Sequence, residues 1–271
     1  KKNEVTTNIK VSKPVKQSSI HLEAGTYIGS DEVGKIEPLK QLIVVAVHVT
    51  EDKFDKILEL GVNDSKQLPS IEKLNMIGKT LTGFDDYEQI KSGKIYENEE
   101  YGLTYCPLIL SNEDYNNYHK EKINANAVLT LVHNEANLKL LHYLTQKGIK
   151  ISDVIIDDYM NGSGNTLFKK YLNNPSFDFE IINDYKGITL NFETKADSKY
   201  KAIVGTSSDI CAYFDKLWQK YLNNKYAMIL DYGNNIKLET LKKSFAKINE
   251  IDPKMRDVKH TNTYVDWLKM S

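Results

Sequence analysis

Residues 124–148 read NANAVLTLVHNEANLKLLHYLTQKG, and residues 151–159 follow shortly after as ISDVIIDDY. In the first stretch apolar residues recur with helical spacing, at positions 128, 131, 132, 138, 141 and 144, and Gly148 follows as a stop signal. The second stretch is a short apolar run of the kind found in buried strands. A long amphipathic helix that leads into a buried strand predicts a crossover connection onto a sheet. These residues therefore favour the α/β class.

The segments before this pair predict more strands of the same sheet. Residues 26–50 contain two β-rich runs, TYIGSDEV and LIVVAVHVT, on either side of a turn-like GKIEPLKQ, and this pattern predicts an antiparallel hairpin. The next segment, DKFDKILELGV, has helical spacing, with Phe54, Ile57 and Leu58 on one face and Gly61 as its stop. A loop, NDSKQLPS, follows it.

The second half of the chain continues the alternation. Residues 178–194, DFEIINDYKGITLNFET, predict at least one more strand, and residues 198–222, SKYKAIVGTSSDICAYFDKLWQKYL, predict a helix. Residues 240–271 are charged and helical in part. The fold expected from the whole pattern is a mixed central β-sheet flanked by helices, with a helical C-terminal part in the same domain as residues 21–239.

Composition excludes some classes of protein and leaves others open. The formal net charge is −1, so any argument for a polyanionic partner has to be local. Residues 1–20 are rich in lysine and predict a flexible basic arm, although an ordinary solvated terminus is the simpler interpretation. The longest apolar run, residues 42–49, is too short to cross a bilayer, which predicts a protein without membrane contact. Two cysteines, Cys106 and Cys211, match no zinc spacing and suggest buried thiols in the reducing cytoplasm.

Two adjacent carboxylates, Asp31 and Glu32, stand where the first β-rich run is about to end. Successive side chains on a strand point to opposite faces, so both can serve one site only if the strand ends or twists there, which Gly34 would allow. The ordinary alternative is an edge aspartate facing solvent beside a glutamate that caps a turn. This pair alone does not decide between the two interpretations.

Further acids follow the later predicted strands. In DVIIDDY the alternation puts Ile155 and Asp157 on one face and makes Asp158 the solvated neighbour, and ligands gather at the carboxyl ends of strands in open α/β sheets. Asp197 lies between a predicted strand and the first turn of a helix, where a plain helix-start carboxylate is the ordinary interpretation. Carboxylates gathered at one sheet end would repel one another, and with no His or Cys cluster nearby a hard cation such as Mg²⁺ is their natural partner. Two such ions could activate water for phosphodiester hydrolysis.

The stretches GSDEVGK, GVNDSKQL, AVLTLVHNEANLKLL, VIIDDY and FETKADSKYKAI occur in an order and spacing that resembles ribonuclease HIII, over most of residues 26–215. The resemblance implies a ribonuclease H-like fold and metal-dependent cleavage of the RNA strand of RNA/DNA hybrids, with Mg²⁺ or Mn²⁺, two ions, leaving 3′-hydroxyl and 5′-phosphate ends. It implies that the metal-binding catalytic acids are Asp31, Glu32, Asp157 and Asp197. Candidate substrate contacts are Gly34, Lys35, Ser65, Lys66, Lys195 and Lys199. No organic cofactor is expected, and the protein is expected to act as a monomer.

The chain also departs from that family pattern. The family continues DEVG into a second glycine, whereas this chain has Ile36, whose Cβ restricts the backbone and its approach to a ribose. This change predicts cleavage at runs of ribonucleotides and little cleavage at a single one. The family's amino-terminal domain, which resembles TATA-binding protein, is not expected in residues 1–25. Two alternatives stay open: a non-catalytic paralogue that binds nucleic acid or a partner, and a phosphatase or exonuclease with similar acids.

Overall fold

The structure is a computed structural model that describes residues 25–35, 39–159, 187–226, 243, 246–248 and 250–255. Six strands in this part of the chain form one sheet in the order β3-β4-β2-β1-β5-β6. Their bounds are β1 Tyr27–Val33, β2 Leu42–Val49, β3 Tyr96–Asn98, β4 Leu103–Leu110, β5 Asp153–Asp157 and β6 Thr189–Glu193. The pairs β1–β2, β2–β4 and β3–β4 are antiparallel, whereas β5 lies parallel to both β1 and β6. The predicted mixed sheet, the hairpin of residues 26–50 and the strand after the long helix are confirmed.

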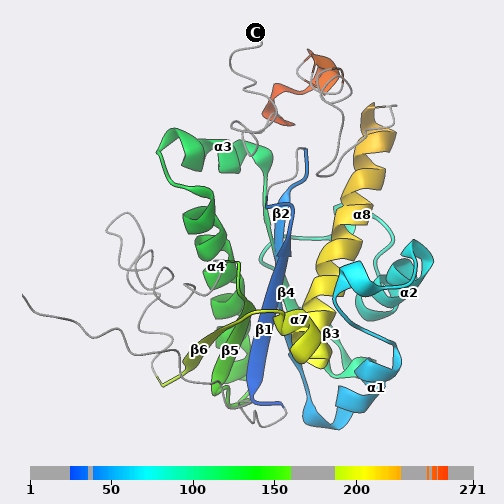
Figure 1. Cartoon of the computed structure of the whole chain (residues 1–271), viewed down its shortest axis with the longest axis vertical. Coiled ribbons are helices and arrows are strands. Elements are labelled where there is room, and N and C mark those ends of the chain that lie inside the picture. Colours follow the sequence, from blue (N-terminus) through cyan, green and yellow to red (C-terminus); the bar gives the residue numbers. More distant parts are fainter. Residues whose placement is uncertain are drawn as a thin grey trace, which may run out of the picture.

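Helices cover both faces of the sheet, with α3 and α4 on one side and α2 and α8 on the other (Figure 1). Their bounds are α1 Phe54–Glu59, α2 Ile71–Thr82, α3 Asn112–Lys120, α4 Ala125–Gln146, α7 Ala196–Lys199 and α8 Thr206–Tyr226, with a π-helical turn at Lys201–Gly205. The predicted helix of residues 124–148 is therefore α4, and the Asn124 side chain caps it by accepting a hydrogen bond from the Ala127 amide at 3.0 Å. The expectation that Leu58 shares the buried face of α1 is wrong, because its side chain is 41% exposed while Ile57 is fully buried.

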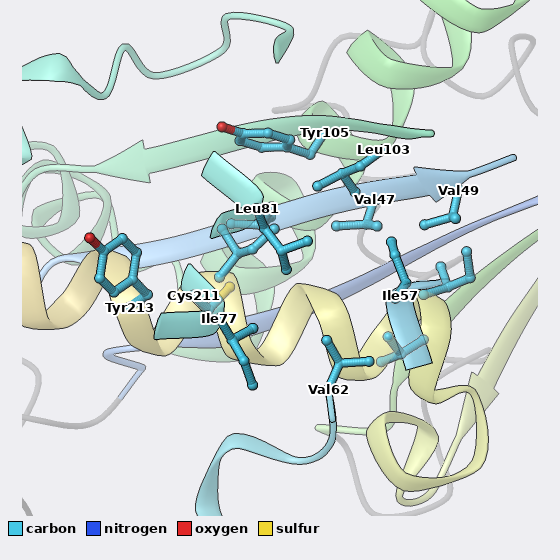
Figure 2. Packing of buried hydrophobic residues seen from close by; sticks show 14 of the residues in the cluster. Val47, Val49, Ile57, Val62, Ile77, Leu81, Leu103, Tyr105, Cys211 and Tyr213 are labelled. Carbon is cyan, nitrogen blue, oxygen red and sulfur yellow. The ribbon is translucent and has the colours of Figure 1, made fainter. Parts of the chain in front are cut away.

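The core has two layers because side chains alternate along the central strands. On β2, Ile43, Val45 and Val47 pack toward α2 and α8, whereas Val44 and Ala46 pack toward α4. Figure 2 shows the first layer, where Ile77 and Leu81 of α2 meet residues of β2, β4 and α8. Each fully buried aliphatic side chain of this kind contributes roughly 1.5–3 kcal/mol. A sheet buried on both faces is a stable base for groups at its edges.

Gly29 lets the π-helical turn lie directly against the central strand. A Cβ at position 29 would be 2.6 Å from Ile203 Cγ2 and 2.7 Å from Val204 Cγ2, and neither distance is possible without movement. β1 and the turn therefore approach each other more closely than any residue other than glycine would allow.

The described C-terminal residues pack back on the domain. The Asn112 side chain at the start of α3 donates to the Met255 carbonyl at 3.0 Å, and the Tyr226 hydroxyl donates to Asp252 at 2.9 Å. Residues 246–248, 250 and 251 are helical, which confirms the helical C-terminal part. The predicted arm, residues 1–20, lies outside the described residues.

Both cysteines are buried free thiols, as predicted. Among the described helices, none combines the length and the apolar character needed to cross a membrane.

Candidate active site

The sheet brings the sequence-predicted acids to one edge. The last register pair of β1 and β5 is Ser30 with Ile156, so Asp31 and Asp157 come next on adjacent parallel strands. β6 ends beside Asp157, and the chain then turns through Thr194 and Lys195 into α7, which carries Asp197 in its first turn. The carboxyl ends of neighbouring parallel strands meet at one edge of a sheet, which explains the convergence.

Asp31 faces α8 and is held there by its backbone. Its amide donates to Ser207 Oγ at 2.8 Å, and the Cys211 thiol donates to its carbonyl at 3.3 Å. Burial raises the pKa of the Asp31 carboxyl well above its ordinary value, and the negative charges of Glu32 and Asp157 raise it further. The carboxyl therefore lies in a buried, negatively charged environment that a cation would relieve.

Glu32 faces the opposite side of β1, toward α4. Its Oε2 lies 3.2 Å from His133 Nε2, and His133 Nδ1 lies 2.9 Å from Ser30 Oγ. Asn137 also donates to Ser30 Oγ at 3.1 Å, and the His133 ring stacks on Tyr159 with centroids 5.3 Å apart. The alternation thus persists to the end of the strand, so Asp31 and Glu32 point to opposite faces of the sheet.

Asp157 and Asp197 are tied to the turn that follows β6. The Ala196 amide donates to Asp157 Oδ1 at 2.7 Å, and the Ser198 amide donates to Asp197 Oδ1 at 2.7 Å. Burial raises the pKa of Asp157 to about 6, and the charges of Asp197 and Glu32 act in the same direction. Burial, followed by the charge of Asp64, also raises the pKa of Asp197.

The predicted substrate contacts differ in how closely they approach the acids. The ammonium of Lys66 lies near enough to lower the pKa of both Asp157 and Asp197. Lys35 donates to the Tyr159 carbonyl at 3.2 Å and lies over the Tyr159 ring, 5.1 Å from its centroid. Lys66 therefore lies close to the acids, whereas Lys35 is held against Tyr159.

Lys195 and Lys199 lie at the two ends of α7. Lys199 forms an ion pair of 2.9 Å with Glu193, a buried acid at the end of β6 that the sequence did not indicate. Lys195 is exposed and has a φ of 58° at the N-cap of α7. Part of the charge of Lys199 is therefore offset by Glu193.

Gly34 ends the acidic strand in a conformation that suits glycine. Its φ is +81°, and a Cβ there would lie 1.9 Å from the Gln41 carbonyl oxygen. The chain therefore turns tightly at this position after Glu32. Ile36, predicted to alter the loop, lies outside the described residues.

The first turn of α8 joins the acidic strand to the loop that carries Ser65 and Lys66. Ser207 Oγ accepts from the Asp31 amide and donates to the Val45 carbonyl at 2.6 Å. The Ser65 amide donates to Ser208 Oγ at 3.3 Å, and the Asn63 amide donates to Asp209 at 3.2 Å.

This turn and His133 are not among the site residues predicted from the sequence. The letters SSD and HN mark polar side chains within helical stretches, but the sequence carries no local signal that these side chains turn inward.

The donor set fits a hard cation in its chemistry. Within the described part of the chain, no three His, Cys, Asp or Glu side chains are positioned as ligands of one ion. The acids nevertheless offer only carboxylate oxygens, and their raised pKa values reflect burial and repulsion that Mg²⁺ or Mn²⁺ would offset.

Comparison with known proteins agrees with this geometry. The family model described as Ribonuclease HII matches residues 28–260. The chain belongs to the ribonuclease HII family. Ribonuclease HIII of Streptococcus pneumoniae strain P1031 is 30% identical to it over 180 residues, which are 66% of this chain and 51% of that protein. A second strain, Hungary19A-6, gives the same identity and coverage. The chain thus spans about half the length of the curated relatives it matches.

Solved structures share the fold. Bst-RNase HIII in complex with Mn²⁺ has a TM-score of 0.67 at 18% identity, covering 97% of this chain and 78% of that one. RNase HII of Archaeoglobus fulgidus, solved with PCNA, has a TM-score of 0.58 at 19% identity, covering 86% of this chain and 94% of that one. The predicted ribonuclease H-like fold is confirmed.

Proposed function

We propose that the protein is a metal-dependent endonuclease that hydrolyses the RNA strand of RNA/DNA hybrids and leaves 3′-hydroxyl and 5′-phosphate ends. The observation that carries the proposal is the gathering of Asp31, Glu32, Asp157 and Asp197 near Lys66, in a chain of the ribonuclease HII family. Its monomeric state and cytoplasmic location stay predictions.

The four acids would hold Mg²⁺ or Mn²⁺, as two ions. When bound, such ions supply a water nucleophile at neutral pH and stabilise charge on the leaving oxygen. Lys66 and Ser65 would bind the phosphate, since both belong to the loop that α8 fixes beside Asp31. No thiol nucleophile is needed, and burial keeps the pKa of Cys211 well above its ordinary value, so this thiol stays protonated.

The positions of Glu32 and His133 suggest how one acid is oriented. The imidazole contacts Glu32 with one nitrogen and Ser30 with the other, so the ring cannot rotate without losing both contacts. Partners of this kind fix the direction of a metal-binding side chain. His133 is therefore proposed as a positioning residue for Glu32.

The test is cleavage of an end-labelled RNA/DNA hybrid with Mg²⁺ or Mn²⁺. Asp31→Asn and Asp157→Asn should abolish cleavage while hybrid binding stays largely intact, because phosphate contacts supply most of the affinity. Asp158→Asn is the matched control and should cleave nearly as wild type. Near-normal cleavage by Asp31→Asn would contradict the assignment. Binding without cleavage by wild type would favour the non-catalytic paralogue, and release of mononucleotides from an end would favour an exonuclease.

Two predictions about substrate follow from residues outside the described part. Deleting residues 1–20 should weaken hybrid binding to a similar extent for all sequences if the arm contacts phosphates. Wild type should cleave a continuous hybrid faster than a duplex with one ribonucleotide, and Ile36→Gly should raise activity if the loop is obstructed. Equal wild-type rates on the two substrates would remove Ile36 from the account of selectivity.

A further inference from the structure

A pocket of about 380 Å³ opens beside the acidic cluster, between the loop of Ser65 and Lys66 and the helix α8. One wall is formed by these two residues, and the opposite wall by Lys40, Asp215 and Lys216. Lys66, whose charge lowers the pKa of Asp157 and Asp197, lines the pocket, so the pocket adjoins the candidate active site. A volume of this size accommodates a small ligand or one nucleotide unit.

The charges around the pocket favour an anion. Lys40 Nζ lies 2.9 Å from Asp215 Oδ2, and both side chains are buried, so this pair contributes little net charge. Gln219 donates to the same Asp215 oxygen at 2.9 Å and accepts from Lys216 at 3.2 Å. Lys216 is thereby held at the rim by a neutral amide, and its positive charge adds to that of Lys66.

The lining also indicates which part of a nucleic acid would fit. Its lining includes the apolar side chains of Leu68, Leu74 and Ala212, and its polar side chains are lysines, serines and Asp215, which is already paired with Lys40. Lysines and hydroxyls that bind phosphate and sugar fix the position of a strand without reading its sequence.

We infer that this pocket binds a phosphate group of the nucleic-acid strand next to the cleavage position, with Lys216 as a substrate-binding residue. The inference rests on the proposed function, because it takes the acidic cluster as the cleavage site. The ligand class is a sugar-phosphate backbone, recognised independently of sequence.

The experiment compares Lys216→Gln with Lys220→Gln, one turn farther along α8. Lys220 is exposed and lines a different pocket with Tyr87 and Tyr221. Lys220→Gln therefore removes the same charge from the same helix at another place. The affinity of the full chain for a short RNA/DNA hybrid is measured in EDTA between about 50 and 200 mM salt. Thermal unfolding of both variants checks that the fold is kept.

Lys216→Gln should weaken hybrid binding about three- to tenfold and reduce the magnitude of the salt slope by about 1. Lys220→Gln should leave both quantities near wild type. Cleavage by wild type together with unchanged affinity and salt slope in Lys216→Gln would overturn the inference while leaving the proposed function intact. Weaker binding in Lys216→Gln without any wild-type cleavage would support phosphate binding in the pocket and refute the proposed nuclease activity. A variant that loses affinity for a polyglutamate peptide but not for the hybrid would assign the pocket to an acidic protein segment and overturn the inference.

Discussion

Asp209→Asn is expected to stabilise the protein, and to do so more strongly as the pH rises. Asp209 is fully buried in the first turn of α8, and burial raises the pKa of its carboxyl from 3.8 to about 8, with smaller contributions from the charges of Asp64 and Asp197. An unfolded chain ionises this carboxyl near pH 4. Between about pH 4 and 8 the folded protein therefore keeps a proton that the unfolded chain has lost.

The sign and size follow from proton linkage. The folded state binds more protons in this window, so the free energy of unfolding falls as pH rises, by up to about 1.4 kcal/mol per pH unit. Asparagine resembles the protonated carboxyl in shape, and its carbonyl oxygen can still accept the hydrogen bond that the Asn63 amide donates at 3.2 Å. The upper limit of the gain at pH 7 is roughly 4 kcal/mol, and relaxation around the buried charge lowers the expected gain to about 2–4 kcal/mol.

The assay is urea unfolding in EDTA at several values from about pH 4.5 to 8.5. The gain should be below about 1 kcal/mol at the acid end, should grow with pH, and should level off above about pH 8. Asp55→Asn, which changes an exposed carboxylate on α1, is the control and should stay within about 0.5 kcal/mol of wild type. If Asp209→Asn were less stable than wild type, or if its gain did not change with pH, Asp209 would not be the titrating group.

The remaining predictions concern the site and its support. His133→Phe keeps an aromatic ring but removes the contact with Glu32, and calorimetric titration should show an apparent Mn²⁺ affinity about tenfold weaker; an unchanged affinity would exclude a positioning role. Because the pKa of Asp157 is raised to about 6, protons compete with the metal below that pH, so the apparent Mn²⁺ affinity should rise with pH and level off above about 7. Gly78→Ala would place a Cβ 2.1 Å from Tyr213 Cγ and should lower the free energy of unfolding by about 1–3 kcal/mol, whereas unchanged urea unfolding would show that α2 and α8 can separate freely.

Sequence alone predicted the parts of the fold that repeat a simple pattern. The hairpin, α4 and β5 were recognised because apolar residues recur in them with the period of their own structure. β4 escaped notice, and Pro107 is one reason, since proline argues against a strand interior. In the structure Pro107 pairs with Val45 of β2 while the short β3 covers β4 only as far as Tyr105, so the missing amide lies where no β3 partner requires it.

The candidate site was predictable where it lies on strand ends and hidden where it depends on packing. Asp31 and Asp157 follow apolar runs, and such positions meet at one sheet edge whatever the details of the fold. His133 and Asp209 come from helices that reach the site across long sequence separations, so no local pattern indicates which of their polar residues turn inward. The pairing of Lys199 with Glu193 was equally hidden, because it depends on the path of the turn after β6.

The close contact at Gly29 fixes the distance between β1 and the π-helical turn. β1 carries Asp31, and the π-helical turn Lys201–Gly205 follows Asp197 within a few residues. The distance between Asp31 and Asp197 therefore depends on how closely β1 and this turn meet at Gly29. A methyl group at position 29 would push the segments apart without touching any carboxylate. In a screen for loss of activity, substitutions of Gly29 would therefore resemble substitutions of the acids, although they leave every carboxylate in place.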